Sequence, residues 1–166
     1  MTTAIRPAAD ADLPPLTALY NHYVRTSPAT FDVDEFTVES RREWFGHYAP
    51  AGRHRLLVAV DEDGGIAGYA TSSRYRPKAA YESSVETSVY VAHSATGQGV
   101  GTALYTALFD ALAGLDVHRA FAGVTLPNDA SVALHHRFGF RRVALFTEQG
   151  RKFGRYWDVA WFEKAL

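Results

Sequence analysis

The sequence predicts a mixed α/β or α+β protein, in which helices pack around one mixed β-sheet. Segments of strand-like composition and of helical periodicity follow one another in the order β-α-α-β-β-β-α-β-α-β-β. The strands partly alternate with helices and partly cluster, which differs from a regular run of βαβ units. The Asp-Gly and Gly-Gly pairs in residues 61–65 predict a hairpin, so the two strands beside it are expected to be antiparallel.

The first part of the chain predicts a short strand and two helices. Residues 4–6 have strand-like composition, and Asp10 and Asp12 offer N-cap oxygens to a helix that follows. The apolar positions of that helix are Leu13, Leu16, Leu19, Tyr20 and Tyr23. A second helix is expected to begin at Thr37. Its positions i, i+3, i+4 and i+7 form a stripe that we interpret as core packing, made of Arg41, Trp44, Phe45 and Tyr48.

The remaining elements are predicted by changes of hydrophobic period. Strands are expected at six segments, namely residues 56–60, 66–71, 84–92, 119–125, 143–147 and 156–162. One helical face is formed by Leu104, Leu108, Leu112 and Leu115. A short helix over residues 128–138 should end at Gly139.

Composition limits the class of protein. The 166 residues correspond to a single domain, 1–166, and 47% of them are hydrophobic, which is enough for a full core. Seventeen basic and eighteen acidic residues give no global charge that would attract nucleic acid. The chain has no cysteine, no apolar run long enough to span a bilayer and no secretory signal pattern. We therefore expect a cytoplasmic protein with no nucleic-acid or membrane partner.

A glycine-rich loop lies between a predicted strand and a predicted helix. In Thr96-Gly97-Gln98-Gly99-Val100-Gly101 the main-chain N–H groups are free of bulky side chains, and the helix dipole favours an anion there. Phosphate binding is one interpretation, and ordinary turn chemistry is the other. The loop lacks the Gly-Lys-Ser/Thr end of a P-loop and the G-x-G-x-x-G spacing of a dinucleotide site. Neither nucleotide hydrolysis nor hydride transfer is supported.

The strand Val89-Tyr90-Val91, the loop Gln98-Gly99-Val100-Gly101 and the helix start Thr102-Ala103-Leu104-Tyr105 together resemble motif A of the GNAT superfamily of N-acetyltransferases. In that superfamily the loop binds the pyrophosphate of acetyl-CoA. The usual pattern is Gln/Arg-x-x-Gly-x-Gly/Ala, and Thr96 departs from it at the first position. The resemblance implies a twisted mixed sheet of six to seven strands flanked by about four helices.

More widely spaced segments resemble the phosphinothricin and methionine sulfone or sulfoximine N-acetyltransferases within that superfamily. These segments run through nearly the whole chain in the expected order: Asn21-His22-Tyr23, Thr30-Phe31, Glu86-Thr87-Ser88, Leu104-Tyr105-Thr106, Leu126-Pro127-Asn128-Asp129 and Trp157-Asp158-Val159. The resemblance implies acetyl-CoA as co-substrate and a homodimer. It implies that cofactor is bound by Val89, Tyr90, Val91, Gly97, Gln98, Gly99, Val100, Gly101, Thr102, Asn128 and Ser131.

Two residues are candidates for acid–base chemistry. An amine must lose its proton to attack a thioester, so a positioned base helps near neutral pH. Glu86, on the strand before the glycine loop, is either a solvent-facing residue or this base, and the resemblance favours the base. His135 could protonate the departing thiolate, orient the amine or share the base role, or it could be a hydrogen-bonded histidine without a catalytic role.

A zwitterionic acceptor also needs a cation for its carboxylate. Arg74, Arg76 and Lys78 precede the Glu86 strand and are candidates, with a plain basic surface loop as the alternative. By resemblance, Phe31 and Tyr81 would line the pocket for the acceptor side chain. We interpret a second basic cluster, Arg151, Lys152 and Arg155, as a solvated loop, with contact to a dimer partner or to a CoA phosphate as the alternative.

The sequence predicts no metal site, since no two histidines are four residues apart and no HExxH motif occurs. The leading hypothesis is acetyl transfer from acetyl-CoA to the α-amine of a small amino acid or analogue in a ternary complex. The alternatives are acetylation of a polyamine, an aminoglycoside or a protein N-terminus, or a non-catalytic acyl-CoA sensor.

Overall fold

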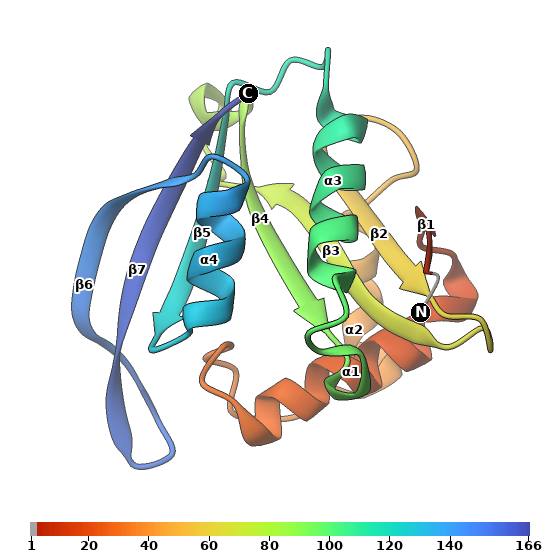
Figure 1. Ribbon diagram of the computed structural model, residues 1–166, viewed down its shortest axis with the longest axis horizontal. Coiled ribbons are helices and arrows are strands. Elements are labelled where there is room, and N and C mark those ends of the chain that lie inside the picture. The colour runs from red at the N-terminus through yellow and green to blue at the C-terminus, as the bar shows by residue number, and fades with distance from the viewer. Residues whose placement is uncertain (1–2) are drawn as a thin grey trace.

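The computed structural model describes residues 3–166 and consists of a seven-stranded sheet flanked by four α-helices over that range (Figure 1). The strands are β1 (Ala4–Pro7), β2 (Arg55–Val60), β3 (Ile66–Arg74), β4 (Ser84–Val91), β5 (Arg119–Leu126), β6 (Arg141–Lys152) and β7 (Arg155–Ala165). The helices are α1 (Leu13–Thr26), α2 (Val38–Phe45), α3 (Val100–Leu112) and α4 (Asp129–Arg137). The predicted order of elements and the mixed α/β class are confirmed.

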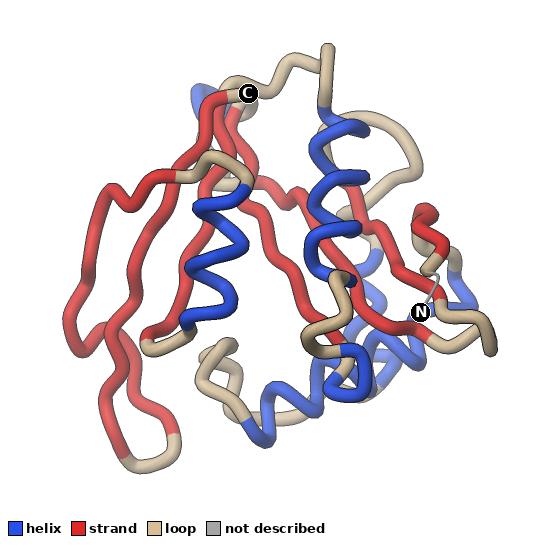
Figure 2. The backbone as a smooth tube through the Cα atoms, viewed as in Figure 1, coloured by secondary structure: helices blue, strands red, loops and turns tan. Residues whose placement is uncertain are grey.

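The sheet opens in its middle, between β4 and β5. The strand order is β1-β2-β3-β4-β5-β7-β6, and every neighbouring pair is antiparallel except β4 and β5. These two parallel strands pair over three positions only, from Ser84 opposite Arg119 to Glu86 opposite Phe121. Beyond Glu86 the strands continue but move apart, as the tube view shows (Figure 2). The unpaired stretch leaves a gap in the sheet.

The two faces of the sheet have separate cores. On one face α3 inserts Leu104, Leu108 and Leu112 against the sheet, and α4 lies on the same side (Figure 1). On the other face α1 and α2 pack around Leu16, Val58 and Tyr69, the centre of a smaller cluster. Side chains alternate along β4. Val85, Thr87 and Val89 therefore point toward α3, and Glu86, Ser88 and Tyr90 point toward α1 and α2.

Local signals at the helix ends are confirmed in part. Thr37 caps α2, since its hydroxyl accepts a hydrogen bond from the Ser40 amide at 3.1 Å. Asp12 precedes α1 but does not cap it with its side chain. Its carboxylate instead pairs with Arg6 at 2.7 Å, which holds the pKa of Asp12 below its usual value. Leu115, expected on the apolar face of α3, lies beyond its end at Leu112 and is 39% exposed.

The two C-terminal strands are longer than the sequence predicts, and they include all three residues of the basic cluster, which therefore lie in strands and not in a loop. Arg151 and Arg155 are exposed, as expected of a solvated segment. The interpretation is wrong for Lys152, which is 4% exposed at the end of β6. Its ammonium donates to the carbonyls of Ser27 and Thr30, at 2.8 Å each. These carbonyls replace water around the charge, so the β6–β7 hairpin is attached to the loop after α1.

Candidate active site

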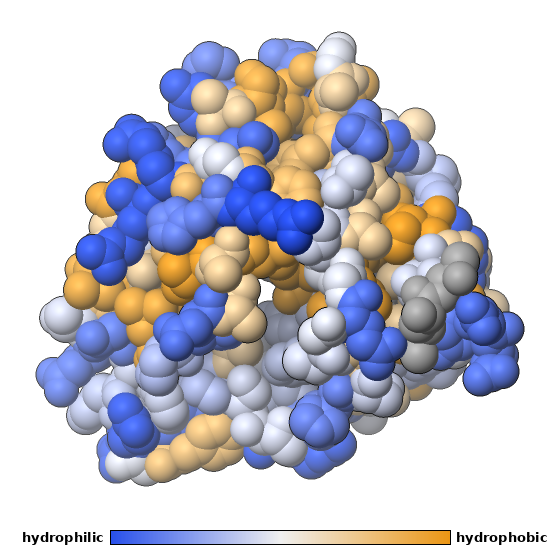
Figure 3. All heavy atoms as spheres, viewed as in Figure 1, coloured by the Kyte–Doolittle hydropathy of each residue, from blue (hydrophilic) through white to orange (hydrophobic). Residues whose placement is uncertain are grey.

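A cleft lies where β4 and β5 separate. It has a volume of about 520 Å³ and is bounded by the unpaired parts of β4 and β5, by the glycine loop, by α4 and by the end of α1. The space-filling view shows this face hollowed near its middle (Figure 3). The cleft exists because the sheet lacks hydrogen bonds there, so main-chain groups and small side chains of both strands remain accessible.

The glycine loop forms an anion-binding end of the cleft. Gly97 and Gly99 have φ angles of 77° and 82°, a left-handed conformation that favours glycine. Gly99 is the N-cap of α3, and no side chain caps this helix end. The first N–H groups of a helix have no partners within it, and the helix dipole places partial positive charge beside them. No atom lies within 4 Å of the position that a Cβ would take at either glycine, so a ligand can approach the loop from that side.

Nearly all of the predicted cofactor residues meet at this cleft. Those that line it are Val89, Tyr90, Val91, Gly97, Gly99, Val100, Gly101, Thr102, Asn128 and Ser131. Gln98 is not among them, because its side-chain amide turns back and donates to the Ser94 carbonyl at 2.8 Å. Asn128 caps α4, its side-chain oxygen accepting from the Ser131 amide at 3.1 Å.

His135 lies in the wall of the cleft and is almost fully buried, with 3% of its surface exposed. Its Nδ1 lies 2.7 Å from the Ser131 carbonyl oxygen, which can only accept, so Nδ1 carries a proton. Burial lowers the pKa of His135 and favours the neutral ring. Nε2 then accepts a hydrogen bond from the Tyr105 hydroxyl at 3.0 Å. In this state no N–H of His135 is directed into the cleft.

Glu86 lies at the point where the strands separate, because it is the last residue of β4 that pairs with β5. Its side chain is on the opposite face of β4 from Thr87, which lines the cleft. Burial raises the pKa of Glu86, and the nearby Arg76 charge partly opposes the increase. A half-buried carboxylate of raised pKa is suited to accept a proton from an ammonium group near neutral pH.

The predicted acceptor residues occupy different positions around Glu86. Arg76 is close enough to Glu86 to act on its pKa, and its guanidinium lies 4.8 Å from the Tyr75 ring centroid. Arg74 donates to the carbonyls of Arg76 and Pro77, so it supports this loop. Tyr81 packs edge-on against Tyr75 at 5.7 Å between ring centroids. Lys78 precedes the short helical turn that contains Tyr81.

Phe31 lies apart from the other acceptor candidates. It is 37% exposed and packs on Gly150 of β6, where any Cβ would overlap its ring. The contact places Phe31 between the loop after α1 and the β6–β7 hairpin. The structure therefore brings Glu86, Arg76 and Tyr81 to one region of the molecule. Phe31 lies in a different region, against the β6–β7 hairpin.

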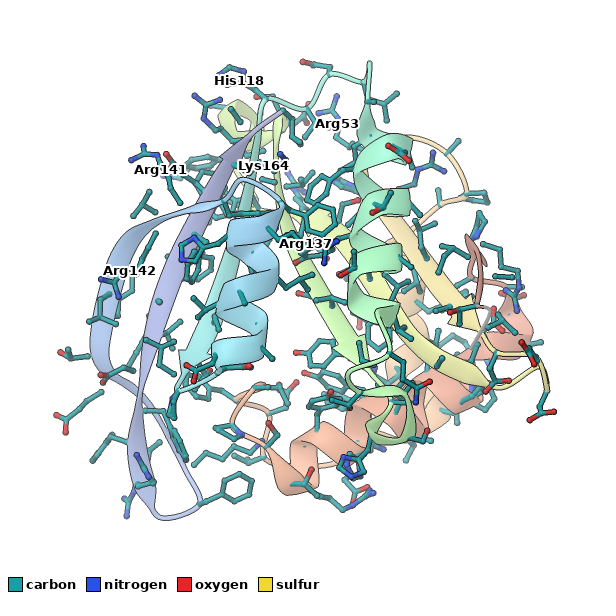
Figure 4. The ribbon with its side chains drawn as sticks, viewed as in Figure 1. Arg53, His118, Arg137, Arg141, Arg142 and Lys164 are labelled. Carbon is teal, nitrogen blue, oxygen red and sulfur yellow. The ribbon has the colours of Figure 1, made fainter. Side chains whose placement is uncertain are left out.

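Sequence reasoning did not assign several residues that line the cleft. They are Tyr23, Ser27 and Ala29 from the α1 end, Thr87 and Ser88 from β4, Tyr105, Gly123, Val124 and Thr125, and Ala130, Ala133, Leu134 and Arg137 from α4. Arg137 projects from the end of α4 toward α3, while the other labelled basic residues lie away from the cleft (Figure 4). The resemblance in segments 21–23, 86–88 and 104–106 was a usable signal for Tyr23, Thr87, Ser88 and Tyr105.

Comparisons with known proteins agree with this geometry. The model of the acetyltransferase (GNAT) domain family matches residues 5–161. A phosphinothricin N-acetyltransferase of Streptomyces coelicolor is 59% identical over 163 residues, covering 98% of this chain and 95% of that protein. An L-methionine sulfoximine/L-methionine sulfone acetyltransferase of Pseudomonas paraeruginosa is 34% identical, covering 100% of this chain and 96% of its own.

The fold also matches solved structures of this class. A phosphinothricin acetyltransferase of Sinorhizobium meliloti, solved in complex with acetyl-CoA, superposes with a TM-score of 0.94 at 32% identity. The match covers 100% of this chain and 89% of that one. The chain therefore belongs to the GNAT acetyltransferase family and is an acetyl-CoA-dependent N-acyltransferase.

The cleft has the features that acetyl-CoA requires. The uncapped start of α3 and the open glycine loop suit a diphosphate, and the apolar side chains of Val89, Val91 and Leu134 suit a pantetheine arm. Within residues 3–166, no group of three or more histidine, aspartate or glutamate side chains could hold a metal ion. Over the same residues, no helix is long and apolar enough to cross a membrane.

Proposed function

We propose that this enzyme acetylates the α-amine of a small amino acid or analogue, of the phosphinothricin or methionine sulfone type, by direct attack in a ternary complex. The observation that carries the proposal is the separation of β4 and β5 immediately after Glu86. It places one carboxylate at the boundary between the cofactor cleft and the opposite face of the sheet. The names of the two similar bacterial enzymes support the same acceptor class.

The proposed reaction uses Glu86 as the base. Glu86 takes a proton from the acceptor ammonium, directly or through one water, and the free amine forms a bond to the acetyl carbon as the bond from that carbon to sulfur breaks. Bound acetyl-CoA supplies the activated acetyl group, and CoA departs from it as a thiolate. The new amide nitrogen loses its second proton to that thiolate through solvent, so the products are the neutral amide and CoA thiol. Arg76 is placed to pair with the α-carboxylate, which is attached to the same carbon as the amine.

We infer a positioning role for His135. Its Nε2 holds the Tyr105 hydroxyl and its Nδ1 is bonded to the helix, so it fixes one wall of the cleft. Of the three roles that the sequence left open, donation of a proton to the thiolate is the least compatible with this arrangement. Burial raises the pKa of Tyr105 well above its usual value, which keeps the hydroxyl protonated as well.

The acceptor class is tested by measuring CoA release from acetyl-CoA with a panel of amines. Methionine sulfone, methionine sulfoximine and phosphinothricin should give the highest kcat/KM, followed by ordinary amino acids. A polyamine, an aminoglycoside and a peptide with a free N-terminus serve as comparators. If one of these comparators exceeds every amino acid, the proposed acceptor class is wrong.

We also propose that the chain acts as a single domain over residues 1–166, as a homodimer in the cytoplasm. The wide similarity to the Streptomyces and Pseudomonas enzymes supports this proposal. Light scattering after size-exclusion chromatography tests the dimer, with a mass near twice 18.3 kDa as the expected result.

A further inference from the structure

Arg41, on α2, is a buried cation that the proposed reaction does not use. It is 5% exposed, and its guanidinium carbon lies 3.8 Å from the Trp44 ring centroid and 4.1 Å from that of Tyr20. Phe36 is the third ring, at 5.2 Å. Such aromatic contacts stabilise a desolvated guanidinium and fix its orientation.

The guanidinium forms no direct ion pair in the described part of the chain, although the carboxylate of Asp32 lines the same cavity as Arg41. Its Nε is buried without a hydrogen-bond partner, and no carboxylate oxygen of residues 3–166 lies within 4.0 Å of the group. Burying an unpaired charge is unfavourable. Aromatic rings offset part of this cost but accept no N–H hydrogen bonds in the plane of the guanidinium. Arg41 therefore has unused donors in a place where water is scarce.

This second cavity, lined by Arg41, has a volume of about 240 Å³ and lies on the α1 and α2 side of the sheet. Hydroxyl groups of Tyr48, Ser73 and Ser88 line the same cavity. The carboxylate of Asp32 also lines it and accepts a hydrogen bond from the Tyr20 hydroxyl.

Ser73 is opposite Glu86 in the β3–β4 register, and Ser88 follows Glu86 on the same face of β4. Ser88 and Tyr90 line both this cavity and the cofactor cleft. The cavity therefore lies next to Glu86 and adjoins the place where acetyl transfer is proposed.

The two cations near the site have different positions relative to Glu86. Arg76 lowers the pKa of Glu86, whereas Arg41 acts on Tyr20 and Tyr90 and not on Glu86. The α-carboxylate of an acceptor is bonded to the carbon that carries the amine, so it must remain close to Glu86. Arg76 satisfies that condition, and Arg41 is placed for a group farther along the acceptor.

We propose that Arg41 and its cavity bind the distal, oxygen-bearing end of the acceptor side chain, such as a sulfone or a phosphinate, and so determine acceptor specificity. This inference rests on the proposed function, because it assumes an amino acid whose amine is at Glu86. Two oxygens on one tetrahedral atom can accept from the guanidinium fork, and the Ser88 hydroxyl can donate to them. Tyr48 and Ser73 are hydrogen-bonded to each other at 2.8 Å, which leaves one hydroxyl proton of that pair to donate. The cavity has room for such an end group.

The test compares methionine sulfone with methionine, which differ only by the two sulfone oxygens. In Arg41→Met, kcat/KM for methionine sulfone should fall by about 10- to 100-fold, the value of a hydrogen bond to a charged group. For methionine, kcat/KM or the competitive inhibition constant should change by less than about threefold. Methionine has no sulfone oxygens, so it has no contact with Arg41 to lose. Arg41→Lys keeps the charge without the fork and should show a smaller loss of the same selectivity.

Arg42→Met is the matched control, because Arg42 is the next residue of α2, is exposed and pairs with Glu39. It should leave both acceptors unchanged. Equal losses for methionine sulfone and methionine in Arg41→Met would overturn the proposal and would assign Arg41 to the α-carboxylate or to stability alone. The melting temperature of Arg41→Met shows whether that variant has a folding defect. If it does, Arg41→Lys decides whether the loss is selective for methionine sulfone or equal for both acceptors. If the wild-type enzyme acetylates no amino acid at all, the proposed function fails first.

Discussion

The two sides of the gap between β4 and β5 recognise their ligands by different means. On the cofactor side, the surface proposed for the diphosphate is mainly main chain, namely the glycine loop and the uncapped start of α3, and apolar side chains are added only along the pantetheine arm. On the acceptor side, it is made of side chains, namely Glu86, Arg76 and the aromatic residues around Arg41. A main-chain surface depends on backbone conformation, whereas the acceptor side depends on the identity of each residue.

The comparison explains why the departure at Thr96 need not prevent cofactor binding. Thr96 is exposed at the beginning of the loop, and the N–H groups of the loop do not depend on its side chain. On the acceptor side, a single change removes a charge or a ring that no neighbouring main-chain group replaces. We therefore expect acceptor-side substitutions to alter turnover or specificity, and cofactor-side substitutions to act mainly through glycine conformation.

Glu86→Gln is expected to have the largest effect. It removes the proposed base while keeping the size of the side chain, so kcat should fall by about 10²- to 10⁴-fold. The Kd of acetyl-CoA, measured by calorimetry, should stay within about twofold of the wild-type value. The reason is that the diphosphate is proposed to bind main-chain N–H groups of the glycine loop and not Glu86. A variant that retains wild-type turnover would remove Glu86 from the mechanism.

Gly99→Ala tests the cofactor side. Gly99 has a φ of 82°, a conformation that costs alanine about 1–2 kcal/mol. The exposed loop of the free variant should shift to avoid part of this cost and must return to bind, so the Kd of acetyl-CoA should rise by at most roughly 5- to 30-fold. Gly114→Ala is the matched control, because Gly114 has a φ of 75°, equally open space around it and a position outside the cleft. Both variants should lose similar stability, and only Gly99→Ala should weaken cofactor binding.

The pH dependence of stability should have opposite signs for the two titratable groups. The pKa of His135 is lowered in the folded protein, so its contribution to stability is present above pH 6.5 and is lost as pH falls through the folded pKa. His135→Asn should lower Tm at pH 7.5 by roughly 2–8 °C, from about 1–2 kcal/mol of lost hydrogen bonding. The difference from the wild-type enzyme should shrink at pH 5.5.

Glu86 behaves in the opposite way, because its folded pKa is raised. Its stabilising contribution is complete below its ordinary pKa of 4.5 and is lost as pH rises through the folded pKa. The Tm of Glu86→Gln should therefore equal or exceed that of the wild-type enzyme at pH 7.5, with the advantage declining toward pH 4.5. Scanning fluorimetry of both variants across this range separates the two signs. A constant offset for both would contradict the assigned environments.

Thr96→Arg should have the smallest effect. It restores the residue type that is usual at this position in the family and adds an exposed positive charge beside the anion site. Such a charge contributes about 0.3–1 kcal/mol, so the Kd of acetyl-CoA should fall by no more than about fivefold. A larger gain would mean that side chains contribute more on the cofactor side than the main-chain model allows.

Several features of the fold were predictable because their causes are local. The hairpin at residues 61–65 depends on turn residues, and the start of α2 depends on the Thr37 cap. The helix between β4 and β5 depends on a spacing of four between leucines. The glycine loop was predictable for the same reason, because only its own residues set its positive φ angles.

The errors and omissions involve contacts between distant segments. Lys152 reads as a solvated basic residue, yet it bonds to carbonyls more than 120 positions earlier in the chain. Arg41 reads as one member of a core stripe, and its lack of a direct ion pair is visible only when every neighbouring element is in place. His135 bonds to the Ser131 carbonyl one turn earlier in its own helix, but its other partner, Tyr105, lies on another helix.

The sequence by itself determined the class of the fold, the order of its elements and the position of the glycine loop, because periodicity and turn residues act within a few positions. It offered Glu86 and His135 as acid–base candidates through the family resemblance. The tertiary structure alone decided where β4 leaves β5, which face Glu86 points to and which cation is close enough to act on it. Those properties arise from strand pairing and burial among segments far apart in the chain, and no local pattern encodes the free energy of such contacts.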